Sequence, residues 1–157
     1  MEQVVFIENQ IKELENQISN LLANTNQVIT TISGVGETLG AIIVSEIGDI
    51  HRFSSPSKLV AFAGLDVKVN QSGEFSSTKN RISKRGSPYL RRAIWLAASR
   101  AAFCDKILSD YYQSLRSRGK HHLTAIGAVA RKLCNIIFVI LRENRPYQII
   151  PPFNQKL

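Results

Sequence analysis

The stretch SPYLRRAIWLAASRAAF, residues 87–103, decides the fold that we expect. Its apolar side chains recur in steps of three and four, which is the spacing of one face of an α-helix. Ser87 is a good N-cap, and Pro88 suits the first turn because its missing N–H would have no helical partner there. The stretch therefore predicts an amphipathic helix that turns one side toward a hydrophobic core. The predicted core side consists of Leu90, Ile94, Ala97, Ala98 and Ala101.

Similar patterns lie on both sides of this helix. Ser55 and Pro56 open a short helix, SKLVAFAGL, that Gly64 can end. The last long helix, residues 123–144, begins with small residues and continues with bulky ones, which belong in a core. Two more helices are expected, from about Glu37 onward and over residues 105–118. We therefore predict an all-α fold.

The N-terminal segment carries a heptad pattern. Its apolar residues alternate in steps of three and four, and Glu, Gln, Asn and Lys fill most other positions. Three heptads are the lower limit for recognising a coiled coil. A long coiled-coil-like helix is expected, which pairs either with another helix or chain, or with its own domain; the pattern favours neither. The seam consists of Val4, Ile7, Ile11, Leu14, Ile18 and Leu21.

These patterns divide the chain into three predicted parts. Residues 1–29 form the coiled-coil-like helix, and residues 30–146 form a compact helical domain. Three late prolines end helical structure, so residues 147–157 are expected to be a loose tail.

The net positive charge of the chain indicates a polyanionic partner. The chain has 157 residues, a net charge of +8 and a pI near 9.8, which favours nucleic acid first and an anionic membrane second. A ribosomal or simply soluble basic protein would share this composition. No apolar run reaches membrane-spanning length and the start does not resemble a signal peptide, so a cytoplasmic protein is expected. Cys104 and Cys134 have apolar neighbours and no CxxC spacing, which predicts reduced core thiols.

Gly34 and Gly36 flank Val35 just before a predicted helix. A Gly-hydrophobe-Gly turn between helices resembles the helix-hairpin-helix motif, in which the backbone approaches a phosphate and the N–H groups of the next helix receive it. A tight interhelical turn that needs positive φ would show the same pattern. Both interpretations remain open at this point.

The stretch VNQSGEFSSTKNRISKRGSPYLRR, residues 69–92, reads as a flexible basic loop or small hairpin that runs into a capped helix. A serine nucleophile needs deprotonation and cationic support, which this stretch could supply to Ser72. From the residues alone, however, a serine in such a Gly- and Ser-rich stretch is expected to be a turn residue. The acidic and histidine residues form no evident metal-binding set, so no cofactor is expected within this chain. The candidate phosphate-binding cations are Lys79, Arg81, Lys84, Arg85, Arg91 and Arg92.

Five blocks, in order, carry a resemblance to a known family. They are ISGVGETLGAIIVSEIGDIHRF, SPSKLVAFAGLD, QSG, RISKRGSPYLRRAIWLAA and AIGAVARKL. Together they resemble the C-terminal half of the transposases of the IS-one-ten group of bacterial insertion sequences, which are guided by a bridge RNA. The resemblance covers the chain from about Thr30 to Pro146, and the helical start is similar to the coiled coil that precedes this domain in the family.

The resemblance implies a bacterial DNA recombinase that is helical, binds DNA and structured guide RNA, and assembles into oligomers. It also implies that the serine of the SG step before the basic block attacks DNA and becomes a phosphoserine; that residue here is Ser72. In the family, an N-terminal RuvC-like domain supplies four acidic residues that bind Mg²⁺.

The sequence departs from the family pattern at three points. Ser33 stands where Pro is common before the glycine turn, and Val67 stands where Pro often follows the GLD block. The chain also starts at or near the coiled coil. We therefore expect an isolated domain, a truncated reading frame or an element remnant, which binds nucleic acid and assembles but is inactive in strand transfer on its own.

Overall fold

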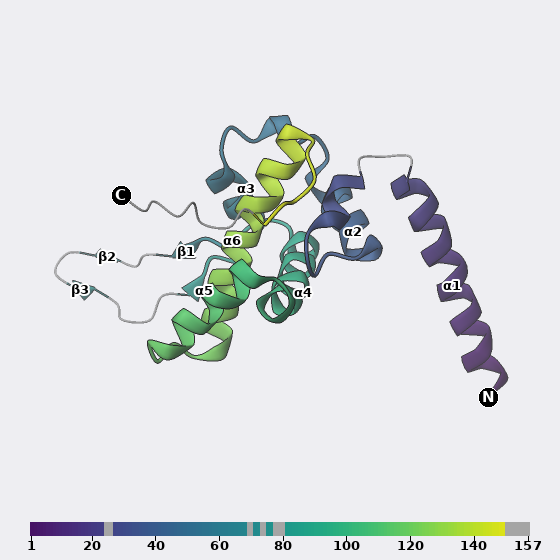
Figure 1. The fold of residues 1–157 in the computed structure, drawn as a ribbon, viewed down its shortest axis with the longest axis horizontal. Coiled ribbons are helices and arrows are strands. Elements are labelled where there is room, and N and C mark those ends of the chain that lie inside the picture. The colour runs from purple at the N-terminus through teal and green to yellow at the C-terminus, as the bar shows by residue number, and fades with distance from the viewer. Residues whose placement is uncertain (24–26, 69–70, 73–74, 77–80, 150–157) are drawn as a thin grey trace.

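The computed structural model describes residues 1–23, 27–68, 71–72, 75–76 and 81–149 of the protein. Within these residues the fold is all-α, as predicted, and the helices after the first one gather around a single hydrophobic core (Figure 1). Two short 3-10 helices and four two-residue strands connect them. The α-helices are α1 (Glu2–Ala23), α2 (Glu37–Ile47), α3 (Pro56–Phe62), α4 (Pro88–Cys104), α5 (Lys106–Ser117) and α6 (His122–Glu143). The 3-10 helices are η1 (Gln27–Thr31) and η2 (Ile50–Arg52).

Local sequence signals set several helix ends. Ser87 caps α4 by accepting a hydrogen bond from the N–H of Leu90 at 3.0 Å, as predicted. Asp105 caps α5 in the same way, through its Oδ1 and the N–H of Leu108 at 3.0 Å. These side chains satisfy backbone donors that the first turn of a helix leaves free. Ser55 stands at the N-cap of α3, but its side chain forms no capping hydrogen bond.

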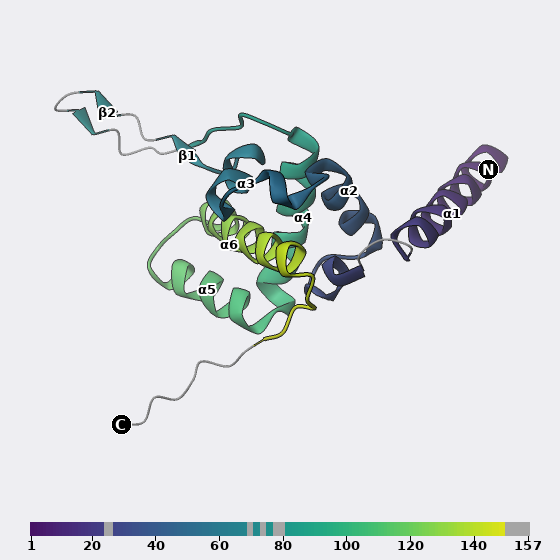
Figure 2. The same ribbon diagram turned by 90° about the horizontal axis from the view of Figure 1, so that it is seen from above.

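The core is built around α4 and α6. The small buried side chains of α4 allow close packing, and α4 contacts α2, α5 and α6. Figure 2 shows α6 passing between α3 and α5, which both contact it. By length and composition α6 could cross a membrane, but 56% of its apolar window is buried inside this protein, as expected for a core helix.

The first helix, α1, stands apart from the core (Figure 1). It contacts α2, and Leu22 near its C-terminal end is buried. Four residues of the predicted seam, Val4, Ile7, Ile11 and Leu14, are 49–59% exposed. These four residues therefore do not pack on the domain that follows, and the pairing of the seam with another chain stays a prediction.

The strands form a narrow extension from the helical core. β1 (Val67–Lys68) pairs antiparallel with β4 (Arg81–Ile82), and β2 (Gln71–Ser72) pairs antiparallel with β3 (Phe75–Ser76). Figures 1 and 2 place β2 and β3 beyond β1, away from the helices.

The C-terminal residues and one cysteine differ from the sequence-based expectation. Tyr147, placed in the predicted loose tail, packs against the core, and its N–H donates to Thr31 Oγ1 at 2.8 Å. Residues 150–157 of that tail lie outside the described part of the chain. Cys134 is buried as predicted, but Cys104 is exposed because it ends α4 where the helix leaves the core.

Candidate functional site

The basic segment after β4 is held against the end of α3. The N–H groups of Ser83, Lys84 and Ser87 donate to carbonyls of residues 62–66 at 2.8, 3.1 and 2.9 Å. The Ser83 hydroxyl also donates to the carboxylate of Asp66. The sequence predicted a flexible basic loop, and for residues 83–87 this prediction is wrong, because backbone hydrogen bonds fix them.

Two glycines allow this close approach. Gly64 and Gly86 both have positive φ, at +66° and +100°. A Cβ on Gly64 would lie 2.4 Å from the Arg85 carbonyl oxygen, and a Cβ on Gly86 would lie 2.0 Å from the Phe62 carbonyl oxygen. Any side chain at either position would push the two segments apart.

Residues 83–87, which these hydrogen bonds hold in place and which we call the pinned segment, expose cations to solvent. Lys84 and Arg85 are exposed, and Lys84 has the left-handed φ of +54°, which is uncommon for a residue with a side chain. Arg92, one turn into α4, is also exposed. Arg91 is partly buried, and its Nη1 donates to the Ala63 carbonyl at 3.4 Å.

The other predicted residues of this stretch lie in or beside the strands. Ser72 ends β2 and is paired with Phe75 of β3, and Arg81 begins β4. The structure describes their backbone positions only. Lys79 lies outside the described residues.

Glu46 ties α2 to the start of α4, a role that the sequence did not reveal. The Ser87 hydroxyl donates to Glu46 Oε2 at 2.6 Å while it accepts the capping hydrogen bond of α4. The pinned basic segment ends at this serine. Its position is therefore fixed by α2 and α3 together.

The glycine turn before α2 has two different glycines. Gly34 has φ +91°, and a Cβ there would lie 2.7 Å from the Ala97 carbonyl oxygen and 2.9 Å from the Ala101 nitrogen of α4. Packing against α4 thus requires this glycine. Gly36 is the exposed N-cap of α2, has no side-chain cap, and would place a Cβ in open space.

The surroundings of the turn only partly resemble helix-hairpin-helix geometry. Val35 between the glycines is buried, but the preceding element, η1, is a short 3-10 helix. A cavity of about 490 Å³ opens beside the turn, lined also by Leu39, Leu96 and Arg100. Of the two glycines, only Gly36 leaves room for a ligand at the helix N-terminus.

Lys84 and Arg85 of the basic segment form no ion pair with a described acidic residue. Within the described residues, the ion pair found within 4.0 Å joins Arg145 and Glu143, far from this segment in sequence. In the same part of the chain, no three His, Cys, Asp or Glu residues gather closely enough to hold a metal ion.

One buried acid lies elsewhere, at the junction of α4 and α5. Asp105 Oδ2 and the Tyr147 hydroxyl are both buried, without hydrogen-bond geometry between them. Burial, and then the nearby charge of Asp105, raise the pKa of Tyr147 to about 12. These two groups lie outside the basic segment, and Tyr147 is held by the hydrogen bond from its N–H to Thr31 Oγ1.

Comparison with known proteins identifies the family. The sequence pattern of the transposases of the IS116/IS110/IS902 family matches residues 26–113, more than half of the chain. This chain belongs to that family. The matched region of this transposase-family chain contains the glycine turn, the strands, the pinned basic segment and α4.

Individual relatives agree with this assignment. An uncharacterized 43.6 kDa protein of insertion element IS110 from Streptomyces coelicolor is 30% identical over 96% of this chain and 38% of its own length. A pilin gene-inverting protein from Moraxella bovis is 30% identical over 87% of this chain and 45% of its own length. A transposase for insertion sequence element IS1328 from Yersinia enterocolitica is 30% identical over 85% and 41%, respectively. The chain thus spans about two fifths of the length of these relatives.

Proposed function

We propose that this chain is the C-terminal part of a DNA transposase, which binds DNA and a structured guide RNA and supplies Ser72 as the nucleophile. The observation that carries the proposal is the pinned segment at the base of the strands. It holds Lys84 and Arg85 exposed and free of ion pairs within the described residues, beside the extension on which Ser72 lies.

The proposed chemistry is one phosphoryl transfer. The Ser72 hydroxyl loses its proton to a base and its oxygen attacks a DNA phosphorus. A P–O bond to serine forms, the bond to one sugar oxygen breaks, and that oxygen takes a proton to leave as a DNA hydroxyl end. Negative charge builds on the phosphoryl oxygens in the transition state, and nearby cations stabilise it. Lys84, Arg85, Arg91 and Arg92 are the described cations that we assign to holding the substrate phosphates.

We assign the Mg²⁺-binding carboxylates to the part of the longer relatives that this chain does not span. On its own the chain is then a binding and assembly domain, which holds nucleic acid without cutting it. Incubating the purified chain with duplex DNA and Mg²⁺ tests this directly. Robust strand cleavage would refute the assignment.

A salt series tests the phosphate contacts. For B-DNA, each phosphate contact contributes a slope of about −0.9 to log K against log salt, so the double variant Lys84→Ala, Arg85→Ala should flatten the slope by about 1.8. Over a fourfold rise in salt the variant then loses roughly 12-fold less affinity than the wild type. The matched control is Lys58→Ala, Lys106→Ala, which removes the same charge from two exposed positions away from the segment. Equal slopes for both variants would show that only net charge matters.

Ser72 needs a separate test in a full-length family member that carries this domain. Ser72→Ala should abolish recombination and the covalent protein–DNA adduct while nucleic-acid binding stays within about twofold. Ser72→Cys offers a different nucleophile at the same position and should retain some adduct. Undiminished recombination by the alanine variant would remove Ser72 from the mechanism.

Self-association through α1 is a second proposed role, which the exposed seam favours. Large apolar side chains lie along α1 on the surface, although burial of such a row is what stabilises a coiled coil. Ile11→Asp, Leu14→Asp should shift the chain to a smaller species in sedimentation velocity. Lys12→Asp, on the same helix but outside the seam, is the control. An unchanged sedimentation coefficient for the seam variant would exclude α1 as the contact.

A further inference from the structure

The outward face of α4 carries cations and apolar groups in a regular order. The inward face is buried in the core. The side opposite to it spans about half a turn: Arg92, Leu96 and Arg100 form one row at steps of four, and Trp95 lies beside the part of this row that holds Arg92 and Leu96. In chain order this face presents Arg91 and Arg92, then Trp95 and Leu96, then Arg100.

The Trp95 ring packs against α6 on one side and borders a cavity on another. An ideal Cβ built on Gly127 of α6 would lie 3.5 and 3.6 Å from two carbons of the indole, so the ring rests against α6 at a position without a side chain. The ring also lines a cavity of about 400 Å³, within the size range of ligand sites. The residues lining this cavity are Ile82, Pro88, Arg91, Arg92, Trp95 and Leu96.

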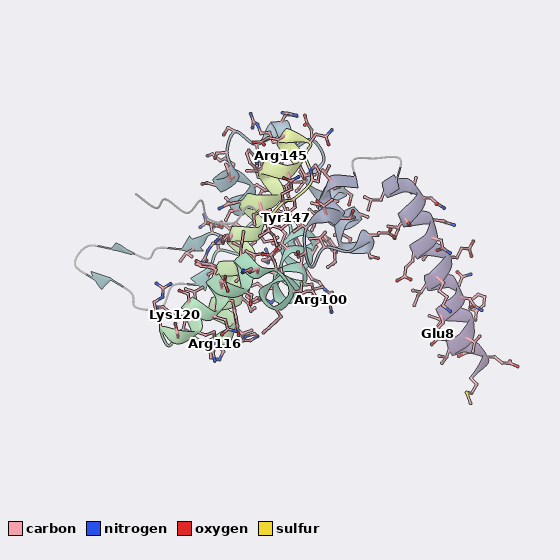
Figure 3. All side chains as sticks on the ribbon, viewed as in Figure 1. Glu8, Arg100, Arg116, Lys120, Arg145 and Tyr147 are labelled. Carbon is pink, nitrogen blue, oxygen red and sulfur yellow. The ribbon has the colours of Figure 1, made fainter. Side chains whose placement is uncertain are left out.

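This cavity shares one lining residue with the cavity beside the glycine turn. Leu96 lines both it and the cavity of about 490 Å³ beside Gly36, to which Arg100 also contributes. Figure 3 shows Arg100 on the outer side of α4. Arg100 lies eight positions after Arg92, which corresponds to a rise of about 12 Å along the helix, so the two cations stand on either side of Leu96 in this row.

The charges on this face lack protein partners of opposite sign. Within the described residues, Arg91, Arg92 and Arg100 form no ion pair, and the contact made by Arg91 is to a neutral carbonyl. A row of cations with an aromatic ring at its side matches a nucleic-acid strand, in which the bases project to one side of the row of phosphates. Aromatic rings bind bases by stacking, which requires that a base face be open, as in an unpaired strand.

We propose that this face of α4 binds an unpaired stretch of nucleic acid, with one base stacked on Trp95 and flanking phosphates held by Arg92 and Arg100. The inference rests on the proposed nucleic-acid-binding function and deepens it. It adds a site outside the pinned segment and specifies that the strand is unpaired at this site.

The chain offers an internal reporter, because Trp95 is its single tryptophan. The experiment titrates the full chain with oligothymidylate, with oligouridylate and with a duplex of equal length, and follows tryptophan emission. Fluorescence anisotropy of labelled strands measures binding in parallel. We expect saturable quenching by the single strands and little change with the duplex. The two single strands compare DNA with RNA as the source of the unpaired bases.

Variants separate the stacking contact from general charge. Stacking of one base on an aromatic ring corresponds to roughly 5- to 140-fold in affinity, so Trp95→Leu should weaken single-strand binding by about that factor, and Trp95→Phe by less. Arg92→Ala and Arg100→Ala should each reduce both affinity and quenching. Lys58→Ala, an exposed cation on α3, is the control and should leave the quenching amplitude unchanged.

The possible outcomes distinguish a failure of the Trp95 inference from a failure of the proposed nucleic-acid binding. Binding in anisotropy without any change in Trp95 emission overturns the inference and leaves the proposed function standing. No binding of any strand at low salt overturns both. Equal quenching by duplex and single strands overturns the claim of an unpaired strand. If Trp95→Leu fails to fold, Arg92→Ala and Arg100→Ala decide the question, because both positions are exposed; unchanged affinity and quenching in both would overturn the inference.

Discussion

Alanine at the two glycines of the turn before α2 should have different effects: Gly34→Ala should lower stability, and Gly36→Ala should leave it almost unchanged. Gly34→Ala forces a side chain into a left-handed backbone, at about 1–2 kcal/mol, and into contact with α4, where overpacking typically costs about 1–3 kcal/mol. We expect the free energy of unfolding to fall by about 2–5 kcal/mol, and Tm by roughly 5–15 °C. Gly36→Ala meets no atom within 4 Å and has φ −81°, so its stability should change by less than about 0.5 kcal/mol.

Thermal unfolding followed by circular dichroism measures both variants, and a binding isotherm with duplex DNA completes the test. If a phosphate approaches the N-terminus of α2, the methyl group of Gly36→Ala occupies its space and weakens binding several-fold without loss of stability. A wild-type Tm for Gly34→Ala would refute the packing argument. Unchanged binding by Gly36→Ala would remove the glycine turn from the nucleic-acid surface.

Three further predictions concern the fixed parts of the site and the core. Ser87→Ala removes the cap of α4 and its bond to Glu46, and chemical denaturation should show a loss of about 1–2 kcal/mol. Gly86→Ala should push the basic segment off the Phe62 carbonyl, which hydrogen exchange would detect as lost protection over residues 83–87. Burial raises the pKa of Cys134 to about 12, so at a pH near 8.5 a thiol reagent should label only exposed Cys104 in the native chain and both cysteines after unfolding.

Local patterns were sufficient to predict the helices, because their causes are local. The apolar spacing of residues 87–103, the serine cap and the proline in the first turn all act within one or two turns of helix. The fixed state of the basic segment could not be predicted in the same way. It depends on Gly64 and Gly86, which are far apart in sequence and meet only in the folded chain.

The candidate site could likewise be predicted only in part from the sequence. Composition identified the basic stretch, and the family resemblance alone singled out Ser72. Neither showed that Gly34 serves packing against α4 while Gly36 stays open, because both glycines look alike in the sequence. Trp95 was hidden for a related reason: the apolar spacing leaves it outside the predicted core side of its helix, and only the absent side chain of Gly127 on another helix shows how the ring is supported.

The N-terminal segment and the rest of the chain carry net charges of opposite sign. Residues 1–29 contain four acidic residues and one lysine, so the rest of the chain carries a charge of +11 within the total of +8. A polyanion is therefore attracted to the helical domain and repelled by α1. Contacts with protein through the exposed Val4, Ile7, Ile11 and Leu14 of α1 would not compete with nucleic acid for the same surface. Joining several helical domains through α1, each with a charge of +10 over residues 30–146, would also multiply weak phosphate contacts, because linked sites bind a long polyanion far more tightly than separate ones.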